Sequence, residues 1–74
     1  MFEKRLTDFR KSLEAEYTGN ADPGLRTVLT ILSDVKTEDD LRRQAARIKH
    51  ASVDGVRDTA MVERILGFLK NSGL

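Results

Sequence analysis

The chain has no cysteine, no tryptophan and a single proline among its 74 residues. Without cysteine, a disulfide framework and a thiolate metal site are both excluded. A small domain that folds without disulfides is typical of a reducing compartment. No apolar run approaches the roughly 20 residues of a membrane span, and the first residues lack the apolar core of a secretory signal. We therefore expect a cytoplasmic protein with no membrane segment.

A strong charge of one sign is also missing, because 13 Lys and Arg side chains stand against 12 Asp and Glu. A formal net charge of +1 is unlike that of a general polyanion binder, which carries a large positive excess. The hydrophobic content of 39% is adequate for a folded chain. We expect a single helical domain over residues 1–74, near the size at which one core is barely sufficient.

What the chain does have is apolar residues at helical spacings of three and four in four segments. These segments predict helices at about 2–17, 23–35, 38–52 and 59–70. Their lengths and short connections predict an all-α fold, a small four-helix bundle of irregular or up-down topology.

Local signals support these boundaries. Asp22 is a preferred N-cap, and Pro23 suits the first helical position because its missing N–H has no partner there. Thr37 is a second N-cap, although Asp40 stands where a capping box usually has Glu or Gln, so we expect an imperfect box. Gly19 is a natural stop for the first helix.

Two of the predicted helices have apolar arcs of roughly 160°, whereas a surface helix needs only somewhat more than about 100°. The surplus must be buried inside the bundle or against another molecule. The first arc comprises Leu25, Val28, Leu29, Ile31, Leu32 and Val35. The second comprises Met61, Val62, Ile65, Leu66, Phe68 and Leu69. Burial of both arcs at the centre of the bundle explains them without a partner, and this alternative stays open.

The first arc suits the buried centre of the bundle, so we assign the surplus to the last helix. There Val62, Leu66 and Leu69 are expected to face the core. A shoulder beside them is predicted to bind a protein partner or a second copy of the chain, because exposed apolar patches commonly mark interfaces. The shoulder comprises Met61, Ile65 and Phe68. The first functional hypothesis is thus a non-enzymatic protein-protein interaction module, a small regulator, adaptor or inhibitor that forms a homodimer through this helix.

A basic cluster in the third helix supports an alternative from another class, a nucleic-acid-binding regulator. The cluster comprises Arg42, Arg43, Arg47, Lys49 and His50. The competing interpretation is a solvated face that pairs with itself. Glu38 stands four residues before Arg42, and Asp39 four residues before Arg43, which is the favourable order for ion pairs on a helix. No register of the sequence places suitable residues for a helix-turn-helix.

Signals for catalysis are weak. His50 and Asp54 are four residues apart, but a lone histidine offers neither a nucleophile nor a set of metal ligands, so a surface ion pair is the expected role. The glycines do not form a phosphate-binding loop. We therefore expect no enzyme activity, no cofactor, no metal and no small-molecule substrate.

Overall fold

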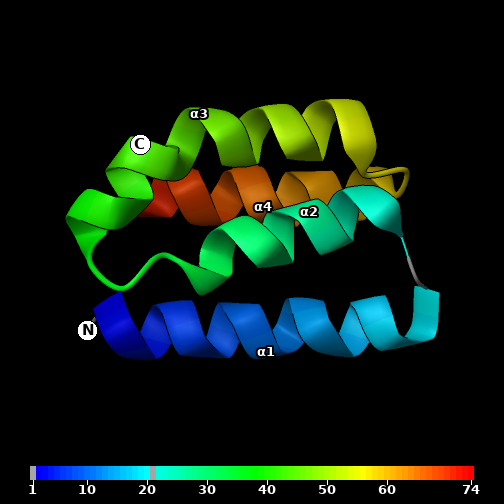
Figure 1. The fold of residues 1–74 in the computed structure, drawn as a ribbon, viewed down its shortest axis with the longest axis horizontal. Coiled ribbons are helices and arrows are strands. Elements are labelled where there is room, and N and C mark those ends of the chain that lie inside the picture. Colours follow the sequence, from blue (N-terminus) through cyan, green and yellow to red (C-terminus); the bar gives the residue numbers. More distant parts are fainter. Residues whose placement is uncertain (1, 21) are drawn as a thin grey trace.

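A computed structural model describes residues 2–20 and 22–74, which form four helices with no strand among them. Helix α1 spans Phe2–Asn20, α2 spans Pro23–Ser33, α3 spans Glu38–Gly55 and α4 spans Thr59–Asn71. Successive helices run in opposite directions, and both termini lie at the same end of the molecule (Figure 1). The prediction of an all-α, small four-helix bundle is confirmed, and of the two topologies left open, irregular and up-down, the described helices have the up-down one. No helix of the described chain is long and apolar enough to cross a membrane.

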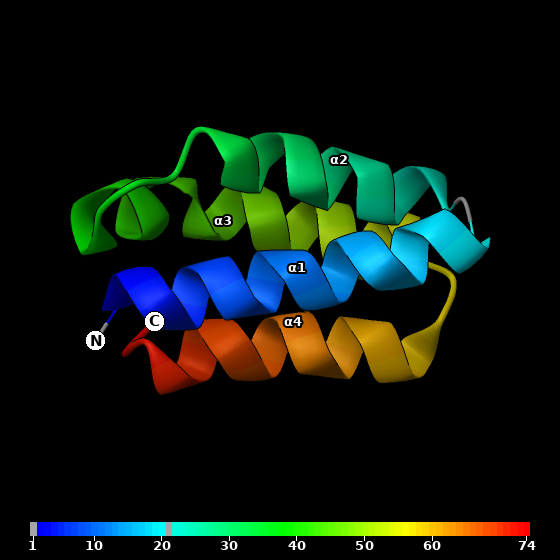
Figure 2. The same cartoon turned by 90° about the horizontal axis from the view of Figure 1, so that it is seen from below.

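The helices follow one another around the bundle, so that α4 lies beside both α3 and α1 (Figures 1 and 2). Helices α2 and α3 pack side by side as an antiparallel pair. A DNA-binding helix-turn-helix instead crosses its helices at about 90–120°. The arrangement agrees with the failure of the sequence to supply such a motif.

Three helices begin at side chains that cap them. Asp22 accepts hydrogen bonds from the backbone N–H groups of Gly24 and Leu25 at the start of α2. Asp58 does the same for the start of α4, and Thr37 for the start of α3. These bonds satisfy N–H groups that have no partner within a helix, which is why each helix starts where it does.

The predicted ends were less accurate than the starts. Helix α1 continues through Gly19 to Asn20, because one glycine costs a helix only about 1 kcal/mol. Helix α2 ends at Ser33 rather than Val35. There the N–H of Val35 bonds the carbonyl of Leu32 in a tightened last turn, and Val35 is nevertheless buried. Helix α3 extends to Gly55, three residues beyond the expected end.

The core is filled by one side of every helix. It is almost entirely apolar, with Ser52 and Asp22 as the buried polar residues of the described chain. The Ser52 hydroxyl donates to the carbonyl of Ile48, so it leaves no unpaired group in the interior. The buried apolar residues are Leu6, Leu13, Leu25, Val28, Ile31, Leu32, Val35, Leu41, Ile48, Val56, Met61, Ile65 and Leu69.

The backbones of α2 and α3 meet most closely at Gly24 and Gly55. A Cβ atom on Gly24 would lie 2.1 Å from the carbonyl carbon of Gly55, so only glycine fits at this crossing. Asp22 secures the same corner, because its second carboxylate oxygen accepts from the N–H of Arg57 at 2.9 Å. One buried carboxylate therefore joins the start of α2 to the turn between α3 and α4.

The Arg57 hydrogen bond is the main reason that the pKa of Asp22 is lowered. Burial of the carboxyl acts in the opposite direction, and the N–H groups of Gly24 and Leu25 add to the lowering. The ionised form is the one that accepts all three bonds, so the folded corner favours the carboxylate.

Candidate functional site

The predicted shoulder of α4 does not form one exposed surface. Met61 and Ile65 are 4% and 0% exposed and lie in the core together with Leu69. Each of these residues is four positions from the next, and together they form the part of the apolar arc that faces the interior. The assignment of Met61 and Ile65 to a surface shoulder is therefore wrong for the isolated chain, because the core lies one step around the helix from the expected stripe.

The third shoulder residue, Phe68, is half-buried and packs on α1. Its ring stacks on that of Phe9, with centroids 4.2 Å apart and planes within 2°. The guanidinium of Arg5 lies 5.9 Å from the centroid of the Phe68 ring. Phe68 thus has a role inside the bundle, which is to join α4 to α1.

Polar contacts continue this junction along both helices. Arg64 on α4 pairs with Glu16 on α1 at 3.4 Å and also donates to the Ser12 hydroxyl. At the other end, Arg5 donates to the hydroxyl of Ser72 at 3.2 Å. The side of α4 that faces α1 is consequently occupied by contacts within the chain.

The side of α4 turned away from α1 is more open. Val62 and Leu66, which were expected to face the core, pack against its edge and are only half-buried. Glu63 and Lys70 are exposed, and a Cβ atom on Gly67 would have no atom within 4 Å among the described residues beyond the backbone of its own helix. We call these five residues (Val62, Glu63, Leu66, Gly67 and Lys70) the outer surface of α4.

The sequence contained a signal for which side of α4 is open. The arc of α4 runs from Phe68 on one side to Leu66 on the other, and Ile65 and Leu69 stand near its middle. The middle of a wide arc is the part most completely buried when the helix has two neighbours. Placing the core at the middle of the arc, and not at Val62 and Leu66, would have identified the open side.

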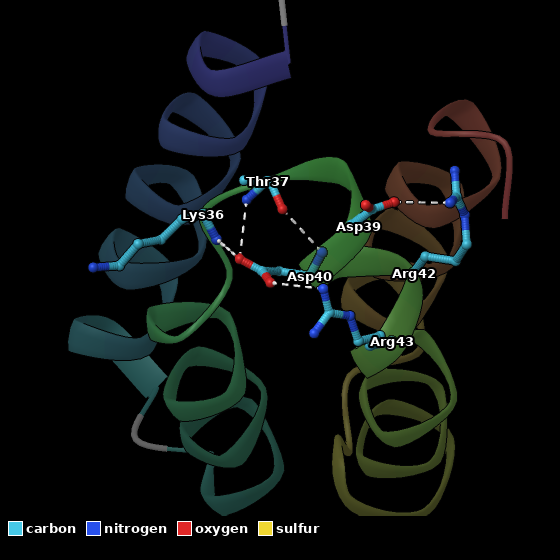
Figure 3. A network of polar contacts seen from close by, with 6 residues as sticks. All are labelled: Lys36, Thr37, Asp39, Asp40, Arg42 and Arg43. Carbon is cyan, nitrogen blue, oxygen red and sulfur yellow. Dashed lines mark hydrogen bonds and ion pairs between the residues drawn. The ribbon is translucent and has the colours of Figure 1, made fainter.

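The first basic residues of α3, Arg42 and Arg43, lie beside the hydrogen bonds that cap the start of this helix (Figure 3). Thr37 accepts from the N–H of Asp40 at 3.1 Å, and Asp40 accepts from the N–H groups of Thr37 and Lys36 at 3.3 and 3.1 Å. The capping box is therefore complete, contrary to the expectation that aspartate would leave it imperfect. These contacts, the Lys36 N–H first, lower the pKa of Asp40 despite an opposing effect of desolvation.

The two ion pairs at the start of α3 join residues three apart rather than four. Arg42 bonds Asp39 at 2.9 Å, and Arg43 lies 4.0 Å from Asp40 (Figure 3). The two predicted pairs, Glu38 with Arg42 and Asp39 with Arg43, are therefore not formed. The carboxylate of Asp39 is bonded to Arg42 instead, and three-residue spacing also brings side chains together on a helix.

The rest of the basic cluster is exposed and mostly has partners on its own helix. Arg47 donates to the Gln44 side chain at 3.1 Å, and His50 pairs with Asp54 at 3.0 Å. Lys49 is exposed. Helix α3 contains four acidic and four basic side chains, so its formal charge is zero with histidine neutral. The cluster is brought together on the surface, but it does not form a strongly positive face.

His50 and Asp54 border a shallow cleft of about 340 Å³ between the start of α2 and the end of α3. Both side chains are largely exposed, which suits the expected surface ion pair. Within residues 2–20 and 22–74, no three His, Asp or Glu side chains are grouped to hold a metal ion. The cleft is lined by Pro23, Gly24, Thr27, His50, Ala51, Asp54 and Gly55.

Comparisons of the chain with protein-family models, with curated proteins and with solved structures give no match.

Proposed function

We propose that this chain is a non-enzymatic protein-interaction module, a small regulator, adaptor or inhibitor, and that its contact surface is the outer surface of α4. The single observation that carries the proposal is the incomplete cover of the α4 arc. Met61, Ile65 and Leu69 complete the core, whereas Val62 and Leu66 remain half-buried on the open side.

Gly67 adds support, because it lies within a helix where glycine is unfavourable by about 1 kcal/mol relative to alanine. Within residues 2–20 and 22–74 no neighbouring atom requires a glycine there, unlike at Gly24 in the α2–α3 crossing. A glycine on a helix surface allows another backbone to approach closely. The proposal includes a cytoplasmic location, which the cysteine-free composition supports.

Binding of nucleic acid through α3 is a weaker alternative. Phosphate contacts need uncompensated positive charge, and the acidic side chains of α3 balance its basic ones. The exposed ion pairs of Arg42 and Arg43 are weak, so both side chains can leave their acidic partners and contact phosphate. The experiment below therefore also tests binding of nucleic acid.

A photo-crosslinking residue placed at position 66, at 47 or at 11 tests the proposal in cells of the source organism. Position 66 replaces Leu66 on α4, position 47 replaces Arg47 on α3, and position 11 replaces the exposed Lys11 of α1 as a control. We expect a protein adduct at 66 and none at 11. A nuclease-sensitive adduct at 47 without a protein adduct at 66 would contradict the proposal and favour the alternative.

A further inference from the structure

We infer that the partner of the outer surface of α4 is a second copy of this chain, bound through two antiparallel α4 helices related by a twofold axis. The inference rests on the proposed function, since it names the partner of the same surface. It starts from the positions of three residues. Glu63, Leu66 and Lys70 are three and four apart, and therefore lie on one side of the helix.

Their charges are arranged for self-pairing. Glu63 and Lys70 lie at equal distances, about 5 Å along the axis, on either side of the midpoint between Leu66 and Gly67. A twofold axis through that midpoint places Glu63 of each copy opposite Lys70 of the other. Within the described residues, neither Glu63 nor Lys70 makes an ion pair in the single chain. A parallel arrangement would instead place like charges together.

The same axis brings Leu66 of each copy against Leu66 of the other at the centre of the contact. Gly67, which follows Leu66, adds no side chain beside this leucine pair and so allows the two helices to approach closely. Because the contact repeats itself by symmetry, one short apolar patch is used twice. The two ion pairs add little affinity, but they select the antiparallel orientation over the parallel one.

The contact area of one helix against another is small, so we expect a weak dimer whose population depends on concentration and falls with added salt. This expectation suits the half-buried state of Val62 and Leu66. A tight obligate dimer would leave a larger apolar area open in the single chain.

Charge reversal tests the inference by analytical ultracentrifugation of the purified full chain. Glu63→Lys and Lys70→Glu each convert two attractive pairs into two repulsive ones, so each variant alone should associate about tenfold more weakly or not at all. An equimolar mixture of the two variants restores both pairs in a heterodimer and should sediment like the wild type. The double variant Glu63→Lys/Lys70→Glu should also recover association.

The recovery in the mixture is the decisive readout, because a damaged fold could not produce it. Lys70 stands in the last turn of α4, where a positive charge favours the helix, so Lys70→Glu also lowers helix stability slightly. Lys11→Glu on α1 is the matched control and should leave association unchanged.

A wild-type chain that stays monomeric at the highest attainable concentration and low salt would overturn the inference. So would single variants that associate like the wild type, or a mixture that does not recover. In the crosslinking experiment, an adduct at position 66 with a different protein would overturn the dimer alone. Absence of any protein adduct at that position would overturn the proposed function as well.

Discussion

Helices α2 and α4 have apolar arcs of the same width, yet the bundle uses them differently. Helix α2 buries almost its whole arc, including Leu25, Val28 and Leu32. Helix α4 buries only the middle of its arc and leaves Val62 and Leu66 half-exposed. Two helices with equally wide apolar arcs are therefore buried to different extents. The positions of the neighbouring helices determine how much of each arc is covered.

The largest expected change in stability comes from shortening a buried leucine of α2, and the same substitution in α4 provides the comparison. Leu32→Ala, in the closed arc of α2, removes a side chain that is 0% exposed and should destabilise the fold by about 3–5 kcal/mol. Leu66→Ala, in the open arc of α4, should cost less than about 1.5 kcal/mol because its side chain is only half-buried at the edge of the core. Urea unfolding followed by circular dichroism measures both. Equal losses would remove the distinction between the arcs.

A smaller but still large effect is expected where α2 approaches α3. Gly24→Ala places a Cβ atom against the backbone of Gly55, which cannot rotate away as a side chain can. We expect a loss of about 3 kcal/mol or a shift of the α2–α3 crossing. The free energy of unfolding and the two-dimensional NMR spectrum would reveal either outcome. An unchanged spectrum with wild-type stability would show that the crossing is looser than the structure describes.

The Asp22 carboxylate makes the closed corner sensitive to acid. Its pKa is lower in the folded chain than in the unfolded one, so its stabilisation is complete above the unfolded value near 3.9 and is lost as pH falls through the folded value. Asp22→Asn should cost about 1–2 kcal/mol at pH 7. It should also flatten the decline of stability below about pH 4.

Asp40 provides the comparison for that titration. It belongs to the capping box of α3, at a half-buried position, and its pKa is lowered too, so Asp40→Asn should flatten the same part of the curve. Thermal unfolding at a series of pH values for the wild type and both variants separates the two carboxyls. A pH profile of Asp22→Asn that superimposes on the wild-type profile would contradict the role assigned to the buried corner.

The smallest expected effect has the opposite sign. Gly67→Ala, on the open side of α4, meets no atom and removes an unfavourable helix glycine, so it should stabilise the single chain by about 1 kcal/mol. Chemical unfolding in dilute solution measures the gain. A loss of stability would mean that the space above Gly67 is already occupied in the folded chain.

Much of the fold could be predicted from local chemistry. Asp22, Thr37 and Asp58 begin helices because their side chains bond N–H groups only a few residues away. Helix ends were less predictable, since Gly19 can remain helical or stop a helix at similar cost. The Asp22 bond to Arg57 spans 35 residues and has no local signature.

The candidate site shows the same division. The surplus of apolar surface on α4 is visible in the sequence, but the predicted shoulder placed Met61 and Ile65 outside the core. The periodicity of a helix gives the relative directions of its side chains and not the direction of the core. Only the positions of α1 and α3 fix that direction.

The sequence by itself thus determined four amphipathic helices, their starting points and the excess apolar width of two of them, because these properties depend on spacing and on contacts within one turn. The tertiary structure decided which part of each arc is buried. In α4, stacking of Phe68 on Phe9 sets the rotation of the helix, with Ile65 inward and Leu66 toward the open side. Such a rotation depends on residues about 60 positions apart, and no local rule contains it.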